Sequence, residues 1–261
     1  MTRRRPALSV CVIAMNEEDR LADCLRSVDF ADEWVVVDSH STDRTREVAA
    51  ALGARVVERD WPGHVEQKNH ALSLAAHDWV LCLDADERVS PELRAAMLAA
   101  LERDDLPDGF EFARRTWYLG RWIRHGGWYP DRKLRLFRRS RGRWGGTNPH
   151  DHVHVDGRVE RLTGDLLHYS YRSLSDHLRT IDSFTTIAAR EKHARGRRAG
   201  LLDLVGRPLW KLLRMYVLRA GFLDGVPGLV VAVSGAYYVF LKYAKLRELG
   251  REGTARGGDA A

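Results

Sequence analysis

Short apolar runs alternate with amphipathic segments over the first hundred residues. Continuous apolar runs of this length are typical of strands buried on both faces of a parallel sheet, and apolar residues at helical spacing indicate helices between them. This order of strand, helix and strand predicts an α/β fold with a mostly parallel sheet, right-handed crossovers and flanking helices. The predicted strands are 8–14, 34–37, 54–58 and 78–83.

Polar residues with capping ability stand before the predicted helices. Asn16, followed by three acids, Ser41-Thr42-Asp43 and Ser90 are expected N-caps. Pro91 then occupies the first helical position, where a missing N–H costs nothing. These signals place helix starts directly behind the first, second and fourth strands.

The pattern changes after Gly109. Strand-like pieces at 110–115, 134–138 and 153–155 alternate with loops rich in Gly, Trp and Arg, and from Ser173 the chain is helical again. We therefore predict three parts, namely a sheet domain over 1–170, a helical extension over 171–249 and a disordered tail over 250–261.

The helical extension has the composition of a membrane-associating segment. Residues 225–241 carry no charge, but at 17 residues they fall short of the ~20 that span a bilayer. The bases that follow, and the amphipathic stretch 201–223 before them, favour a position in the membrane interface. A spanning helix, a buried helix and a helix in a homo-oligomer contact are the alternatives.

Composition excludes several classes of protein. With 44% apolar residues the chain is not wholly disordered, and three scattered cysteines without a CxxC pair exclude a disulfide framework. No apolar signal segment follows the basic N-terminus, so we expect no secretory signal. Together with the extension, this predicts a location at the cytoplasmic face of the inner (plasma) membrane, peripheral or monotopic.

The net charge of +6 is concentrated in one stretch. Residues 112–143 hold eleven Lys and Arg and one acid, interleaved with Trp and Tyr. Arginine pairs with phosphate, and aromatic faces stack on sugar rings or on bases. The stretch therefore predicts an anionic partner, and a nucleic-acid or membrane-surface binding protein is one alternative.

Acids and amides gather at the carboxyl ends of the predicted parallel strands, where open α/β sheets bind ligands. Asn16-Glu17 follows the first strand, Asp38 the second, and Asp84-Ala85-Asp86 the fourth. Two carboxylates two residues apart can hold a hard divalent cation, which in turn can neutralise a diphosphate.

These motifs together resemble the glycosyltransferase family 2 enzymes of GT-A fold, and among them the bacterial lipopolysaccharide-core glucosyltransferases. The likeness covers roughly residues 8–249. It rests on the runs 8–17, 31–43 and 84–88, on Asp60-Trp61-Pro62-Gly63 with Gln67-Lys68-Asn69, on Gly127-Trp128-Tyr129-Pro130-Asp131 with Arg135-Leu136-Phe137, and on Gly164-Asp165-Leu166-Leu167-His168.

The resemblance implies roles on the donor side. Asn16 and Glu17 would face the nucleotide, Asp38 the uracil ring, and Lys68 the nucleotide or its phosphates. Asp84 would lie near the ribose and the sugar. Asp86 would ligate Mg²⁺ or Mn²⁺, and His168 would complete the metal shell, unless it is a satisfied core histidine.

The resemblance also implies an inverting reaction, which needs one base on the acceptor side. Relatives often carry His-Glu where this chain reads His150-Asp151, so Asp151 is the expected base, although its side chain is one methylene shorter. Asp131 is the reserve candidate. We assign acceptor binding to Trp128, Tyr129, Asp131 and Arg135.

The expected activity is therefore metal-dependent transfer of a hexose, first of all glucose, from a UDP-sugar to an anionic glycolipid. Heptose of the lipopolysaccharide inner core is the first expectation for the acceptor, with a polyprenyl-linked glycan or a peptide as alternatives, and no nucleic acid is expected to bind. His150, His152 and His154 share one strand face and could hold zinc instead of forming an exposed edge.

Overall fold

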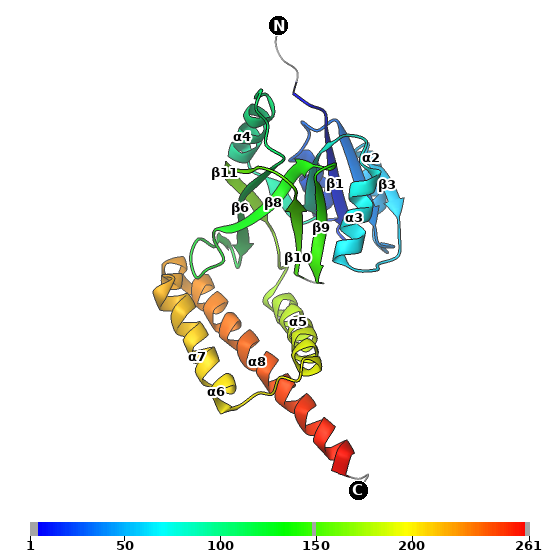
Figure 1. The fold of residues 1–261 in the computed structure, drawn as a ribbon. Coiled ribbons are helices and arrows are strands. Elements are labelled where there is room, and N and C mark those ends of the chain that lie inside the picture. Colours follow the sequence, from blue (N-terminus) through cyan, green and yellow to red (C-terminus); the bar gives the residue numbers. More distant parts are fainter. Residues whose placement is uncertain (1–4, 148–149, 259–261) are drawn as a thin grey trace. The chain divides into compact units, whose positions relative to one another are not determined.

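The computed structural model describes residues 5–147 and 150–258, which form two compact units (Figure 1). The first unit comprises the chain up to Arg115 together with Pro130–Tyr169. The second unit comprises Thr116–Tyr129 and the chain from Ser170 onward. Residues 116–129, which the sequence pattern places with the sheet domain, thus group with the C-terminal helices.

Four parallel strands form the N-terminal half of the sheet in the first unit. Their order is β3 (Arg55–Glu58), β2 (Glu33–Asp38), β1 (Leu8–Ala14) and β4 (Trp79–Asp84). All seven residues of β1 are buried, as expected for a strand covered on both faces. The predicted α/β fold is confirmed, and the carboxyl ends of β1, β2 and β4 lie at one edge.

Side chains of the central strands alternate between two apolar layers. Val10 and Val12 of β1 face one layer, whereas Cys11 and Ile13 face the other. The first layer is covered by α1 (Leu21–Arg26), α2 (Thr45–Ala51) and α4 (Pro91–Leu101), and the second by α3 (His64–Leu74).

The second half of the sheet is largely antiparallel. Beyond β4 come β8 (Asp131–Arg138), β6 (Gly109–Tyr118), β11 (Val159–His168) and β5 (Glu87–Val89), so the sheet is mixed. A separate antiparallel ribbon consists of β9 (Gly142–Thr147) and β10 (His150–Val155). The three predicted strand pieces lie inside β6, β8 and β10, whereas β5 and β9 have no counterpart in the sequence pattern.

Two predicted helix starts are wrong, and one is confirmed. Helix α1 begins at Leu21 rather than after Asn16, because the Asn16 side chain accepts a hydrogen bond from Thr42 N at 2.8 Å, in the next loop. Helix α2 begins at Thr45, later than predicted; Arg44 at its N-cap position makes no side-chain cap, although Asp43 Oδ1 accepts a hydrogen bond from Thr45 N at 3.0 Å. Ser90 caps α4 as predicted, since its Oγ accepts a hydrogen bond from Leu93 N at 3.2 Å.

The second unit is helical and has its own apolar core. Helix α5 (Leu174–Ala194) starts at the N-cap Ser173, as predicted. The predicted amphipathic stretch 201–223 is divided into short pieces, and α8 (Gly225–Gly258) is helical through part of the tail expected to be disordered. Helix α8 packs against α5 and α7 (Figure 1). The remaining elements are β7 (Arg121–Trp122), α6 (Leu201–Leu204), α7 (Gly206–Leu213), the π-helical η1 (Arg214–Leu218) and the 3₁₀-helical η2 (Gly221–Asp224).

One described helical stretch, Gly221–Arg251, is long and apolar enough to cross a membrane, a test that the core helix of a soluble protein also passes. Much of the apolar surface before and at the start of this stretch is exposed. Leu201 and Leu202 are about three-quarters exposed. Eleven further apolar residues are between 42% and 72% exposed, namely Val205, Leu209, Trp210, Leu213, Val217, Leu218, Phe222, Leu223, Val226, Leu229 and Val233.

Candidate active site

Hydrogen bonds join the loops that follow β1 and β2. Asn16 and His40 adopt positive φ angles of 57° and 55° directly after these strands, a conformation that costs energy for any residue other than glycine. The amide of Asn16 donates to Ser41 Oγ at 2.9 Å, and the amide of Glu17 donates to Thr45 Oγ1 at 2.8 Å. The backbone at this edge is therefore fixed.

Asp38 lies at the end of β2 with its side chain fully buried. One carboxylate oxygen accepts a hydrogen bond from Ser41 N at 2.8 Å, and the other accepts one from Ser41 Oγ. The carboxylate of Glu17 lies 3.8 Å from Arg20 Nη1. The contacts of Asn16, Glu17 and Asp38 with a nucleotide stay predictions.

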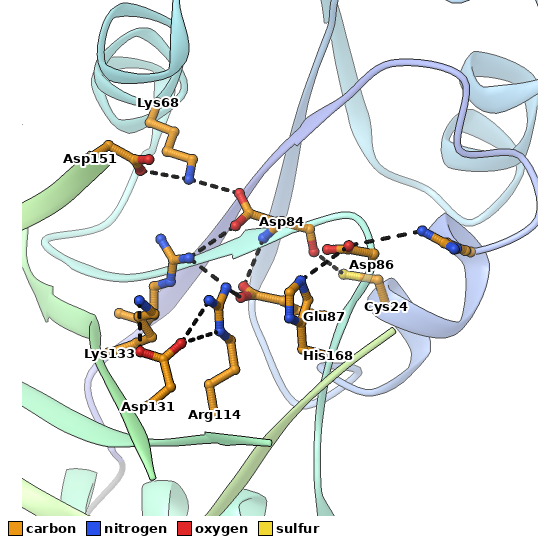
Figure 2. Close-up of polar contacts among 12 residues, drawn as sticks. Cys24, Lys68, Asp84, Asp86, Glu87, Arg114, Asp131, Lys133, Asp151 and His168 are labelled. Atoms are coloured by element: carbon orange, nitrogen blue, oxygen red, sulfur yellow. Dashed lines mark hydrogen bonds and ion pairs between the residues drawn. The ribbon is translucent and has the colours of Figure 1, made fainter. Parts of the chain in front are cut away.

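Lys68 joins two predicted site residues that are far apart in the chain (Figure 2). Its Nζ, on α3, lies 2.8 Å from Asp84 Oδ1 at the end of β4 and 2.8 Å from Asp151 Oδ2 on β10. The Lys68 side chain is only 7% exposed, and its ammonium lies over the Trp144 ring, 4.5 Å from the centroid. The predicted donor residue and the predicted base thus share one buried cation.

Arg135 and Glu87 extend this network beneath Asp84. Arg135 Nη2, on β8, lies 3.0 Å from Asp84 Oδ2 and 3.4 Å from Glu87 Oε1. The other oxygen of Glu87 accepts a hydrogen bond from Asp84 N at 3.0 Å. The Glu87 side chain is fully buried, and its role was missed although it directly follows the Asp-x-Asp motif. The signal that could have revealed it is an acid inside a short strand between the apolar Ala85 and Val89.

Asp131 is held by two cations of the same network (Figure 2). Arg114 Nη2 lies 2.7 Å and Lys133 Nζ 3.0 Å from its carboxylate. Arg114 also reaches Glu87 Oε1 at 3.0 Å, so it connects Asp131 to the buried centre. Sequence reasoning missed Arg114, which stands in the basic stretch among many other arginines.

These contacts shift the ionisation of the central groups. Burial alone would raise the pKa of Asp84, but Lys68 and Arg135 more than offset it and hold that pKa far below the usual range. Burial lowers the pKa of Arg135, but Glu87 and Asp84 raise it by more than burial lowers it, so the net shift is upward. Asp84 and Arg135 therefore stay ionised at neutral pH.

Asp86 and His168 are brought together, as expected for two ligands of one metal ion. Asp86 Oδ2 lies 3.3 Å from His168 Nε2 and 3.9 Å from Arg20 Nη1. No group of three or more His, Cys, Asp or Glu able to hold a metal occurs among residues 5–147 and 150–258. A carboxylate and an imidazole suit Mn²⁺ or Mg²⁺ if phosphate oxygens and water complete the shell, as is usual for Mg²⁺.

Two of the three histidines of β10 lie side by side. The rings of His152 and His154 lie 4.3 Å apart, centroid to centroid, as expected for alternate residues on one strand face. The His150 side chain and Pro149 lie outside the described residues, so the predicted trio is described only in part.

The residues assigned to acceptor binding fall into different units. Asp131 and Arg135 belong to the charged network of the first unit, whereas Trp128 and Tyr129 belong to the second unit. The Trp128 ring lies 5.4 Å from that of Tyr118, in the second core. Trp128 therefore contributes to packing in addition to any role in binding.

Comparison with known proteins identifies the family. Residues 9–156 match Glycosyl transferase family 2. The chain is also 31% identical to the lipopolysaccharide core biosynthesis glycosyltransferase LpsC of Rhizobium meliloti, over 92% of this chain and 91% of that protein. This chain is a family 2 glycosyltransferase.

Other proteins are also similar to this chain. The glycosyltransferase is 31% identical to an uncharacterized glycosyltransferase of Rickettsia typhi, over 93% of this chain and 87% of that one. It is 27% identical, with a TM-score of 0.35, to glucosyl-3-phosphoglycerate synthase from Mycobacterium tuberculosis in complex with Mn²⁺, UDP and phosphoglyceric acid, over 44% of each chain. The family match contains every predicted site residue except His168. The alignment with LpsC, over 92% of this chain, includes His168 as well.

Proposed function

We propose that this glycosyltransferase moves glucose from UDP-glucose, with inversion at the anomeric carbon, to a phosphorylated sugar of the lipopolysaccharide inner core. Family membership supports glycosyl transfer. The full-length likeness to a protein of lipopolysaccharide core biosynthesis supports the choice of acceptor. The observation that carries the proposal is Lys68, whose ammonium is shared by Asp84 and Asp151.

This shared cation suggests how donor binding prepares the base. In the structure one carboxylate oxygen of Asp151 already accepts a hydrogen bond from Lys68, at 2.8 Å. A donor diphosphate offers Lys68 a stronger anionic partner. We infer that Lys68 turns toward the phosphates and leaves Asp151 to take the proton of the attacking hydroxyl.

Asp86 and His168 would hold Mg²⁺ or Mn²⁺, and a cation bound there would neutralise charge on the departing diphosphate. Asp84 would position the ribose and the sugar at the same strand end. Arg135 contacts the Asp84 carboxylate and keeps it ionised, and Glu87 orients the same residue by accepting a hydrogen bond from its backbone amide.

Release of UDP from UDP-glucose with Mn²⁺ tests the donor and metal parts of the proposal. Asp86→Asn should abolish both acceptor-independent release and transfer. Asp151→Asn should retain release and lose transfer by roughly 10²-fold or more, the scale of general base catalysis. Asp105→Asn, which changes only an exposed ion pair with Arg158, is the matched control. Unchanged turnover in Asp86→Asn would refute the assignment.

A thermal-shift panel of UDP-, GDP- and dTDP-sugars with Mn²⁺ tests the choice of nucleotide. A ligand that binds only the folded state raises its stability in proportion to the logarithm of ligand concentration. UDP-glucose should therefore stabilise the protein most. Stabilisation by GDP- or dTDP-sugars alone would exclude a UDP donor.

We also propose that the second unit binds the cytoplasmic face of the membrane. The thirteen exposed apolar residues between Leu201 and Val233 are far more than single, scattered exposed residues. Arg207 and Arg214 stand among them, as expected for a surface that also meets anionic headgroups.

Cosedimentation with vesicles of phosphatidylcholine and phosphatidylglycerol tests this surface. The double variant Leu201→Asp with Leu209→Asp should lose vesicle binding while keeping its circular dichroism spectrum. The matched control, Leu174→Asp with Ile187→Asp, alters exposed apolar residues of α5 and should bind normally. Equal binding by both variants would contradict a membrane role for the apolar surface.

A further inference from the structure

A cavity of about 230 Å³ lies within the second unit. Residues from α5, α7, η1 and α8 line it, together with the loop Gly126–Trp128. That loop is fixed to the end of η1, because Gly126 N donates a hydrogen bond to the Arg219 carbonyl at 2.9 Å. The charged network of the first unit contributes none of its lining.

The cavity is cationic. Lys211 and Arg219 line it, and no carboxylate is among its lining residues. Within the described part of the chain, neither cation has a carboxylate oxygen within the 4.0 Å of an ion pair. Burial lowers the pKa of Lys211, and repulsion from Arg214 and Arg219 lowers it further. An anion in the cavity would remove this unfavourable interaction.

Aromatic and hydroxyl groups complete the lining. Trp128, Tyr171 and Tyr238 present ring surfaces, and Thr180 and Ser234 present hydroxyls. Aromatic faces with nearby hydrogen-bonding groups suit a sugar ring. The volume is below the roughly 300–1,000 Å³ of pockets for drug-sized ligands. It therefore suits one small ring with a charged substituent and excludes a whole acyl chain.

Two glycines keep the space open. A Cβ on Gly127, at φ +86°, would collide with the Arg219 guanidinium, and a Cβ on Gly235 would lie 2.5 Å from Met215 Sδ. Side chains at these positions would displace the groups that line the cavity. Glycine at both positions thus leaves Arg219 and Met215 where they line the cavity.

We propose that this cavity binds a phosphate-bearing sugar of the acceptor, with Lys211 and Arg219 contacting the phosphate and Trp128 the ring. Naming the ligand as part of the acceptor rests on the proposed function. Binding of a phosphorylated sugar to the cavity does not depend on it.

Isothermal titration with glucose 6-phosphate, in the presence of saturating UDP and Mn²⁺ to occupy the donor site, tests the proposal. Lys211→Gln and Arg219→Gln should each weaken binding by at least about tenfold, as expected for the loss of a charge-assisted hydrogen bond. Arg214→Gln and Lys242→Gln remove nearby cations that do not line the cavity, and should bind within about twofold of the parent. Equal losses in all four variants, or equally tight binding of glucose, would overturn the proposal.

Two further probes separate the possible sources of phosphate. Inorganic phosphate should bind more weakly than glucose 6-phosphate, because it makes no ring contacts. Vesicles containing phosphatidic acid should bind Lys211→Gln as well as they bind the parent. If Lys211→Gln lost vesicle binding and the parent did not bind glucose 6-phosphate, the cavity would be a lipid headgroup site and the sugar site would be refuted.

The same measurements distinguish this inference from the proposed function. If glucose 6-phosphate binding depends on Lys211 and Arg219 but no UDP-sugar is turned over, the cavity is confirmed and the proposed function fails. If UDP-glucose is turned over and glucose 6-phosphate does not bind, the inference about the cavity fails by itself.

Discussion

Replacing Glu87 by glutamine removes the one fully buried carboxylate that connects Arg114 with Arg135. The side chains are nearly the same size, so packing is kept while one charge is lost. Glu87 Oε2 also accepts the Asp84 amide at 3.0 Å. In one orientation of the glutamine amide, its NH₂ group would face this N–H and leave two donors in contact.

The magnitude follows from what each arginine keeps. Breaking a buried ion pair typically costs ~3–5 kcal/mol, because the remaining charge is left without compensation. Here Arg135 keeps Asp84 at 3.0 Å, and Arg114 keeps Asp131 at 2.7 Å. We therefore expect the lower end, about 3 kcal/mol. For a chain of this size that corresponds to a fall in Tm of roughly 6–12 °C.

Urea unfolding followed by circular dichroism, together with thermal scans, measures this loss. The matched control is Glu111→Gln, which breaks the exposed pair with Arg161 at 2.5 Å and should cost at most about 1 kcal/mol. If Glu87→Gln unfolded at the same urea concentration as Glu111→Gln, the buried network would contribute nothing specific to stability, and the reasoning would be wrong.

Three more predictions concern the supports of the site. Gly164→Ala should lower the free energy of unfolding in urea by more than about 3 kcal/mol, because Gly164 has φ +88° and a Cβ there would collide with the Leu93 backbone. The control Gly53→Ala, at φ +87° with open space around it, should lower it by only about 1–2 kcal/mol. Ser90→Ala should lower the free energy of unfolding by about 1 kcal/mol through loss of the N-cap, visible as a lower urea midpoint. The lowered pKa of Asp84 stabilises the folded state fully above the unfolded-state pKa of about 3.9, and this stability is lost as pH falls toward the folded-state pKa. In Asp84→Asn the free energy of unfolding should therefore fall less steeply with decreasing pH below about 3.9. An unchanged dependence on pH would contradict the ion pairs of Asp84.

The elements that the sequence predicts are those with a strong local signal. Strand β1 is a continuous apolar run, and α4 has both a serine cap and a proline at its first position. Strand β9 has no such signal, since three of the six residues of Gly142–Thr147 are glycine, and it is a strand because it pairs with β10. The start of α1 was misplaced because Asn16 bonds to the loop after β2. The start of α2 was placed slightly too early, because Asp43, which accepts a hydrogen bond from Thr45 N, stands one residue before the N-cap position.

The candidate site shows the same division. Asp84 and Asp86 could be found because they follow an apolar strand directly. The contact between Lys68 and Asp151 spans 83 residues, and nothing local to either residue indicates it. Glu87 was missed because its one local signal, the apolar residues on either side, is weak, and a lone acid in a short segment is usually solvated. Its burial is tolerable only because two arginines reach it from β6 and β8.

The balance of charge in the first unit bears on the proposed metal. Four carboxylates, of Asp84, Glu87, Asp131 and Asp151, meet four cations, of Lys68, Arg114, Lys133 and Arg135. The network is formally neutral, so it gives an incoming diphosphate little net attraction.

The Asp86 and His168 pair lies outside this network and is a place where a metal ion could add positive charge. We therefore expect UDP to bind weakly after treatment with EDTA, and excess Mn²⁺ to restore its affinity by at least about tenfold. Asp86→Asn should remove this Mn²⁺ dependence, whereas Asp105→Asn should keep it. Equal UDP affinity with and without Mn²⁺ would mean that Lys68 and Arg135 alone hold the diphosphate, and the metal proposal would fall.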